Sequence, residues 1–295
     1  MFGPNKYFRN YVKINYSHRD KEFFRIYRDT INLFKEKFNL KDYDILLIPG
    51  SATLGIEALM YSLTVPLKIT GIKGSFTNRW KIINDRYESF KEQGLKPVNL
   101  YFLYETSKSE YYSELEPGFI DATSGFPFYD IPENSLGFVT CLNKQLSSYC
   151  GVAVIGIRKN CWHMFKLDND DNLSYLNLRR YYEYSKINQT PSTFPTHILK
   201  HFYGVLKKYN VEKLREDILK KWECFDKYLP RKMIIGTPNS PVITFKNKAI
   251  PDYICKKYEL YGYSANREHI QLFLYNGTLH QFKKLFKKIK DSILF

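Results

Sequence analysis

Lys144 is the residue whose position most clearly suggests chemistry. It stands in a polar loop between two apolar runs, 138–140 and 152–157, which the sequence predicts to be buried strands. A lysine at the end of an interior strand loses part of its hydration, which disfavours the ammonium form and frees an amine to attack an aldehyde. An ordinary loop lysine in water is the alternative, and this stretch alone does not decide between the two.

The turn PGSATLG at 49–55 is a candidate phosphate site. It joins a predicted buried strand at 43–48 to a helix that includes Ile56–Met60. Backbone N–H groups at a helix N-terminus attract an anion, and the hydroxyls of Ser51 and Thr53 could add donors. It is not a Walker loop, because no lysine follows a second glycine in that register. An ordinary capped helix explains the same turn equally well.

Three more side chains follow predicted strands. Thr106 comes after the strand at 98–104, and Asp121 comes directly after the apolar pair Phe119-Ile120. Asp121 is either a helix cap or a ligand contact. Phe76 follows the strand at 67–72 and is either a core aromatic or a ring that stacks on a planar ligand.

Strands and helices alternate through residue 157, with helices predicted at 22–38 and 81–93. This alternation predicts an α/β fold with a mostly parallel sheet, in which ligands bind at the carboxyl ends of the strands. The residues expected at that edge supply a phosphate site, a hydroxyl, a carboxylate and an amine. Pyridoxal 5'-phosphate requires this set: a lysine for its aldehyde, a carboxylate for its ring nitrogen and a helix N-terminus for its phosphate.

The composition is that of a globular protein with an excess of positive charge. The 295 residues are 44% hydrophobic and 17% aromatic, and the formal net charge is +15. Because the basic residues are spread along the chain, nucleic acid is an unlikely partner. The densest group, five lysines between 283 and 290, fits the solvated face of a helix that buries Phe282, Leu285, Phe286 and Ile289.

The cysteines and the hydropathy indicate a cytoplasmic protein. Five cysteines without a CxxC pair predict free thiols in a reducing compartment and no metal site. The polar N-terminus shows no signal peptide. The apolar stretch 45–67 is interrupted by Pro49, Gly50 and Glu57, so no membrane span is expected.

The last third of the chain predicts a smaller α+β domain. A helix is expected at 173–184, and a long helical region is expected at 197–228, ending before Pro230. Strands at 242–245 and 270–275 then alternate with helices at 251–261 and 278–292. We expect a large domain at 1–195, from which residues 1–20 could instead join the small domain, and a small C-terminal domain at 196–295.

Seven stretches in a common order resemble one enzyme family. They are SHRDKEF at 17–23, LLIPGSATLGIEALMYS at 46–62, GSFTNRW at 74–80, YETS at 104–107, FIDATSGFP at 119–127, NKQ at 143–145 and QTPSTFP at 189–195. From Ser17 to about Thr193, and weakly beyond, the chain resembles the class V branch of fold-type I pyridoxal-phosphate aminotransferases. That branch includes the phosphoserine, serine–glyoxylate and 2-aminoethylphosphonate aminotransferases. The resemblance implies a compact version of their fold.

The resemblance also implies roles for the residues around the cofactor. Lys144 would be the Schiff-base lysine and proton shuttle, Asp121 would pair with the pyridinium nitrogen, and Phe76 would stack on the ring. Thr106 would bond the ring hydroxyl. The residues implied at the phosphate are Ser51, Ala52, Thr53, Ser124 and Asn143.

A second implied feature is a homodimer with shared active sites. Gln189 and Thr190 match the family segment that reaches the phosphate of the other subunit. His18 and Arg19 match a segment near the substrate entrance.

Two departures from the family concern the sheet and the substrate. The chain is short between Trp80 and Val98 and between Thr106 and Phe119, so a strand or helix of the large domain could be missing. Gln271 stands where relatives carry the arginine for the substrate carboxylate, and an amide cannot replace a bidentate cation. Either another arginine takes this role, with candidates Arg19, Arg79 and Arg267, or the substrate is not an ordinary α-amino acid.

The implied activity is amino-group transfer between an amine or amino acid and a 2-oxo acid or aldehyde, in a ping-pong cycle. A lyase on the same fold and a non-catalytic homologue that binds an anionic partner are the alternatives.

Overall fold

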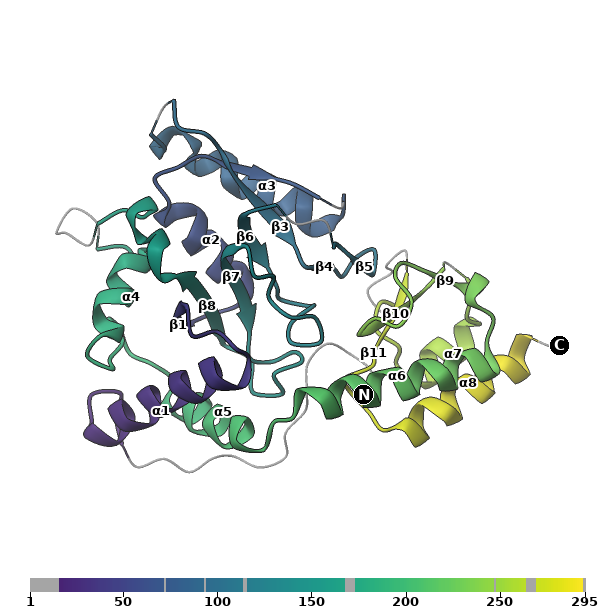
Figure 1. The fold of residues 1–295 in the computed structure, drawn as a ribbon. Coiled ribbons are helices and arrows are strands. Elements are labelled where there is room, and N and C mark those ends of the chain that lie inside the picture. The colour runs from purple at the N-terminus through teal and green to yellow at the C-terminus, as the bar shows by residue number, and fades with distance from the viewer. Residues whose placement is uncertain are drawn as a thin grey trace.

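The computed structural model describes residues 16–71, 73–92, 94–113, 116–167, 173–246, 248–263 and 269–293. Two bodies are visible in Figure 1, a larger one around a six-stranded sheet and a smaller one around a three-stranded sheet. A two-stranded hairpin lies between them.

The large sheet has the strand order β1-β8-β7-β6-β3-β2. Strands β2, β3, β6 and β7 are parallel to one another, whereas β8 runs antiparallel to both β7 and β1. The bounds are β1 Tyr43–Pro49, β2 Leu67–Ile69, β3 Val98–Phe102, β6 Gly118–Asp121, β7 Ser135–Cys141 and β8 Val152–Arg158. The predicted α/β fold with a mostly parallel sheet is therefore confirmed.

Helices cover both faces of this sheet, so its strands are apolar on both sides. In β1, Ile45 and Leu47 face one hydrophobic core while Leu46 and Ile48 face the other. The first core is closed by α1 (Lys21–Lys37) and α5 (Thr196–Lys208), which pack side by side (Figure 1). The second is closed by α2 (Ala52–Ser62), α3 (Ser75–Tyr87) and α4 (Leu178–Ser185).

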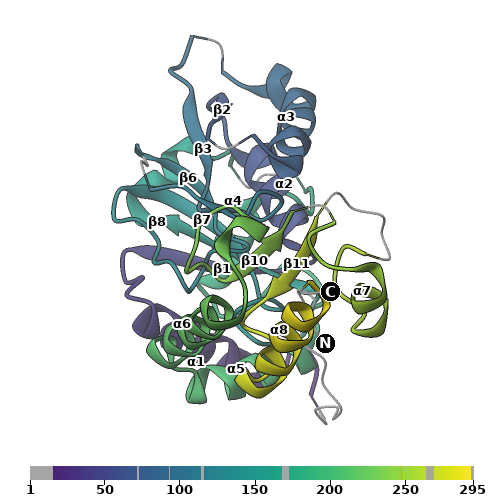
Figure 2. The same ribbon diagram turned by 90° about the vertical axis from the view of Figure 1, so that its right-hand side faces the viewer.

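The smaller body has an antiparallel sheet in the order β11-β10-β9, covered by helices α6 and α8 (Figures 1 and 2). Its elements are α6 Val211–Tyr228, β9 Ile234–Ile235, β10 Val242–Phe245, α7 Asp252–Lys257, β11 Ile270–Phe273 and α8 Leu279–Ile293. On α8, Phe282, Leu285, Phe286 and Ile289 are buried and the five lysines are exposed, which confirms the predicted solvated face.

The hairpin of β4 (Tyr104–Glu105) and β5 (Glu110–Tyr111) connects the two bodies. Ser109 O accepts a hydrogen bond from Thr237 N at 2.7 Å, and Tyr111 N donates to Thr237 Oγ1 at 3.0 Å. Gly236 permits this approach, because a Cβ there would lie 2.2 Å from Ser109 O, and its φ of +83° favours glycine. The hairpin therefore links the small sheet, through hydrogen bonds, to the carboxyl ends of the strands in the large sheet.

Several predicted boundaries differ from the structure, and three helical ones differ most. The helix expected from 81 begins at Ser75, and the helix expected from 173 begins at Leu178. The helical region expected at 197–228 is two helices, because Tyr209 is extended and the Asn210 side chain caps α6 through Lys213 N at 2.8 Å. Short 3₁₀ turns lie at Glu88–Phe90, Lys159–Met164 and Arg231–Met233.

The break between α5 and α6 bears on the domain division. The predicted division at 195/196 would place α5 in the small domain, yet Ile198, Leu199 and Phe202 of α5 pack with Phe23 of α1 in the core of the large sheet. We therefore propose that the division lies at 209–210.

Among the described residues, no helix combines the length and the apolar character needed to cross a membrane.

Candidate active site

A cavity opens at the carboxyl ends of β3, β6 and β7, and we call it the Lys144 cavity. Its space is about 300 Å³, counting the part open to solvent. The lining residues are Ala52, Thr53, Phe76, Trp80, Phe102, Tyr104, Thr106, Asp121, Thr123, Ser124 and Lys144. Most of the residues expected around the cofactor are thus brought together from separate parts of the chain, as the parallel sheet predicts.

Lys144 is half-buried and its amine faces the interior of this cavity. Nζ donates a hydrogen bond to Ser124 Oγ at 2.7 Å, and the Thr106 hydroxyl donates to the same oxygen. Ser124, expected at the phosphate, lies between the amine and Thr106. The amine is therefore held by a directed hydrogen bond and not left to rotate in water.

Asp121 ends β6 with its carboxylate directed into the cavity. Its Oδ1 accepts the Thr123 N–H at 3.0 Å, and its Oδ2 accepts the indole N–H of Trp80 at 2.9 Å. The first bond closes a local turn and caps no helix, so the ligand-contact alternative remains for this side chain. Phe76, one turn before Trp80 on α3, is half-buried at the cavity, and the Arg79 guanidinium carbon lies 5.3 Å from its ring centroid.

The Ser51–Thr53 turn combines the two interpretations that its sequence allowed. Ser51 is the N-cap of α2 and its Oγ accepts the Leu54 N–H at 3.3 Å, while Ala52 and Thr53 line the Lys144 cavity. Gly50 has φ +147°, and a Cβ there would lie 2.3 Å from Leu54 Cδ2. The N-terminus of α2 is thus a capped helix end that also faces the cavity, where its dipole favours an anion.

Gln145, whose role the sequence did not suggest, holds the cavity's two loops together. Its side chain is buried, with Nε2 donating to Ser124 O at 2.5 Å and Oε1 accepting Phe128 N–H at 3.1 Å. The stretch NKQ contained it, but an amide next to a lysine carries no signal that it bridges backbone groups. Asn143, on the other side of Lys144, is half-buried and does not line the cavity.

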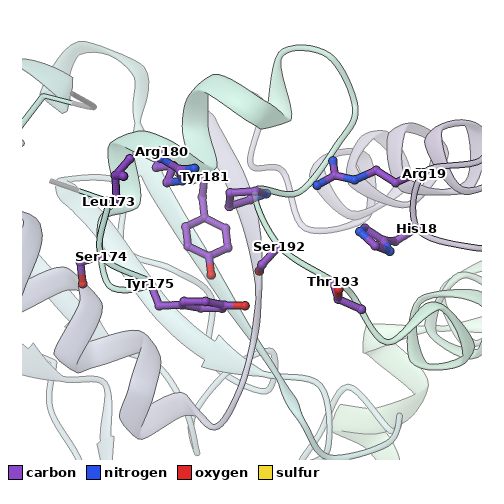
Figure 3. A pocket seen from close by; sticks show the side chains of 10 residues that line it. His18, Arg19, Leu173, Ser174, Tyr175, Arg180, Tyr181, Ser192 and Thr193 are labelled. Atoms are coloured by element: carbon purple, nitrogen blue, oxygen red, sulfur yellow. The ribbon is translucent and has the colours of Figure 1, made fainter. Parts of the chain in front are cut away.

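Four other predicted residues gather elsewhere: His18 and Arg19 line a second cavity, which we call the Arg19 cavity, and Gln189 and Thr190 are bonded to Arg19. Arg19 Nη1 donates to Gln189 Oε1 at 3.0 Å and to Thr190 O at 3.1 Å. The cavity is about 710 Å³ on the same measure, and Figure 3 shows Arg19, His18 and Arg180 around it. Its other lining residues are Leu173, Ser174, Tyr175, Tyr181, Pro191, Ser192 and Thr193.

The Arg19 cavity is polar and basic. Partial burial, and then the nearby Arg19 charge, lower the pKa of His18. Burial raises the pKa of Tyr181 to about 12, so this phenol stays protonated. Within one chain, therefore, the predicted substrate residues His18 and Arg19 line a different cavity from Lys144, and the predicted cofactor residues Gln189 and Thr190 are hydrogen-bonded to Arg19 and do not line the Lys144 cavity.

Gln271 lies on β11, with 6% of its surface exposed, and links the small sheet to the Lys144 cavity. Its Nε2 donates to Thr106 O at 2.5 Å and to Thr244 Oγ1 at 3.0 Å. The two N–H hydrogens of the amide are therefore both used inside the protein. Arg267, another predicted candidate, lies outside the described residues, and Arg79 is exposed on α3.

No protein-family model matches the chain, and no curated protein matches its sequence. Solved structures do match. A phosphoserine aminotransferase from Cytophaga hutchinsonii superposes with a TM-score of 0.75 at 16% identity, over 94% of this chain and 91% of that chain. The chain shares the fold of aminotransferases.

Two further structures agree. A ureidoglycine–glyoxylate aminotransferase from Bacillus subtilis gives a TM-score of 0.72 at 15% identity, over 96% of this chain and 87% of that one. A phosphoserine aminotransferase from Trichomonas vaginalis with bound pyridoxal phosphate gives 0.69 at 14% identity, over 94% and 90%. The fold expected from the seven sequence stretches is confirmed.

Proposed function

We propose that this protein is a pyridoxal-phosphate-dependent aminotransferase in which Lys144 carries the cofactor. One observation carries the proposal: the Lys144 cavity combines an amine, a carboxylate, an aromatic ring and a helix N-terminus at one edge of the sheet. When bound, the cofactor would supply an aldehyde carbon and an electron sink. The amino group would pass from an amine or amino acid to a 2-oxo acid or aldehyde in a ping-pong cycle.

The residues of the cavity would divide the work by their chemistry. Lys144, aligned by Ser124, would hold the cofactor and move a proton at the reacting carbon. Asp121 would face the ring nitrogen, and Phe76 would cover a ring face. The α2 N-terminus at Ala52–Thr53 would bind the phosphate.

We propose a homodimer in which the Arg19 cavity faces the partner's Lys144 cavity. Supporting this, Gln189 and Thr190, which the sequence resemblance assigns to the partner's cofactor, are hydrogen-bonded to Arg19. The three residues would then act on the same neighbouring site. A shared site would also account for the distribution of the predicted residues over two cavities of one chain.

For the substrate we propose an anionic or phosphorylated amine held mainly by Arg19. Candidates are amines like 2-aminoethylphosphonate or amino sugars, besides ordinary amino acids. Gln271 supports this choice indirectly, because its N–H groups are bonded to Thr106 and Thr244 and are not free for a carboxylate. A carboxylate bound against a neutral amide without a cation would cost several kcal/mol.

The test is to trap the lysine that carries the cofactor. Purified protein is mixed with pyridoxal phosphate, reduced with borohydride and digested, and the modified lysine is located by mass spectrometry. We expect label on Lys144, and we expect Lys144→Ala to lower turnover by at least about a hundredfold.

Lys91 is the matched control, because burial lowers its pKa to about 8 and it does not line the Lys144 cavity. Label on Lys91 in place of Lys144 would mean that a lowered pKa alone selects the lysine. A protein that takes up no cofactor would refute the proposed function.

A further inference from the structure

The indole of Trp80 lines the Lys144 cavity, and neither the sequence nor the proposed chemistry gives it a role. Trp80 lies one turn after Phe76 on α3 and is 2% exposed, and its ring lines the cavity. Its Nε1–H donates to Asp121 Oδ2 at 2.9 Å, across 41 positions of sequence. A buried indole N–H needs an acceptor, and here the acceptor is the carboxylate of Asp121 at the end of β6.

Asp121 also lies beside a second buried carboxyl group. Glu105 is fully buried, and among the described residues its Oε2 has no hydrogen-bond partner. Burial raises the pKa of Glu105, and the charge of Asp121 contributes to the same shift. Asp121 itself receives a hydrogen bond on each carboxylate oxygen, from Trp80 and from Thr123.

The two donors fix the carboxylate in both position and rotation. Thr123 N–H binds Oδ1 and the indole binds Oδ2, so the plane of the carboxylate is set by one group on each oxygen. Each oxygen keeps further acceptor capacity, which leaves room for one more donor from the cavity. A rigid ring on α3 thus holds an acid on β6 in a defined direction.

We propose that Trp80 is a positioning residue that aims the Asp121 carboxylate at the ring nitrogen of the bound cofactor. This inference rests on the proposed function, and it adds a residue outside the set that the sequence assigned to the cofactor. Trp80 acts through Asp121, so its effect depends on the ring nitrogen being present.

Trp80→Phe removes the N–H donor and keeps an aromatic ring. Trp162→Phe is the matched control, because Trp162 Nε1 donates to Asp44 Oδ2 at 2.8 Å, in a pair that does not line the Lys144 cavity. Binding to cofactor-free protein is measured by equilibrium dialysis with two ligands. One is pyridoxal phosphate, and the other is its analogue in which carbon replaces the ring nitrogen.

We expect Trp80→Phe to weaken binding of pyridoxal phosphate about tenfold, the usual effect of a misplaced charge-assisted hydrogen bond, and to change binding of the analogue less than about twofold. Trp162→Phe should change neither. Equal weakening for both ligands would make Trp80 a packing residue only, and unchanged binding of both would also overturn the inference. Failure of the wild-type protein to bind either ligand would instead refute the proposed function.

Discussion

Replacing Gln271 with leucine tests whether this amide joins the two bodies or binds substrate. Leucine has nearly the same volume, so the change removes two N–H donors with little cavity formation. Thr106 O would lose a hydrogen bond of 2.5 Å, and Thr244 Oγ1 would lose one of 3.0 Å but keep its contact with Ser109. The main loss is therefore one of two hydrogen bonds to the buried carbonyl of Thr106, because Ser109 N–H still donates to that oxygen at 3.3 Å.

A hydrogen bond whose acceptor keeps a second donor contributes about 0.5–1.5 kcal/mol, so we expect the free energy of unfolding to fall by about 1 kcal/mol. If the two bodies unfold together, this lowers the melting temperature by about 3 °C. Thr106 would also lose its fixed position, which should weaken cofactor binding modestly. The Michaelis constant for an anionic substrate should change little, because the amide does not reach the cavity.

The assay combines thermal unfolding of the cofactor-free protein with steady-state kinetics. Gln281→Leu is the control, because Gln281 accepts a hydrogen bond from Thr278 N at 2.8 Å at the solvent-facing start of α8. This surface change should cost less than about 0.5 kcal/mol. An unchanged melting temperature with a large rise in the Michaelis constant for Gln271→Leu would refute the reasoning, since the amide would then bind substrate.

Two other predictions concern the Arg19 cavity and a buried lysine. Arg19→Ala should lower kcat/KM for an anionic substrate by about tenfold or more. Separately, light scattering of the wild-type protein tests the dimer, because a fully active monomer of 35.1 kDa would reject shared sites. Lys91, buried and donating to Leu63 O at 2.7 Å, has its pKa lowered from 10.5 to about 8. Between these values the unfolded chain binds more protons than the folded one, so Lys91 should raise the free energy of unfolding by about 3 kcal/mol as pH increases. Urea unfolding at about pH 7.5 and about pH 10 should show this rise in the wild-type protein and not in Lys91→Met. Parallel changes in the two proteins would contradict the prediction.

Many helices and strands of both bodies could be predicted because their sequence signals are local. The strands at 43–49 and 152–158 are continuous apolar runs, as strands covered on both faces must be, and α8 shows its buried and solvated faces in the spacing of its residues. The placement of Asp121 and Lys144 at one sheet edge followed from their positions after parallel strands.

Contacts between residues far apart in the sequence were determined only by the tertiary structure. Helix α3 begins at Ser75, six residues before its apolar pattern predicted, because Ser75 N–H donates at 3.1 Å to the hydroxyl of Ser107 on a distant turn. Two other long-range hydrogen bonds also had no signal in the sequence: the indole N–H of Trp80 to Asp121, and the amide N–H of Gln271 to the backbone oxygen of Thr106. A periodic pattern records which face of an element is buried, but it carries no information about which polar group on another element completes a hydrogen bond.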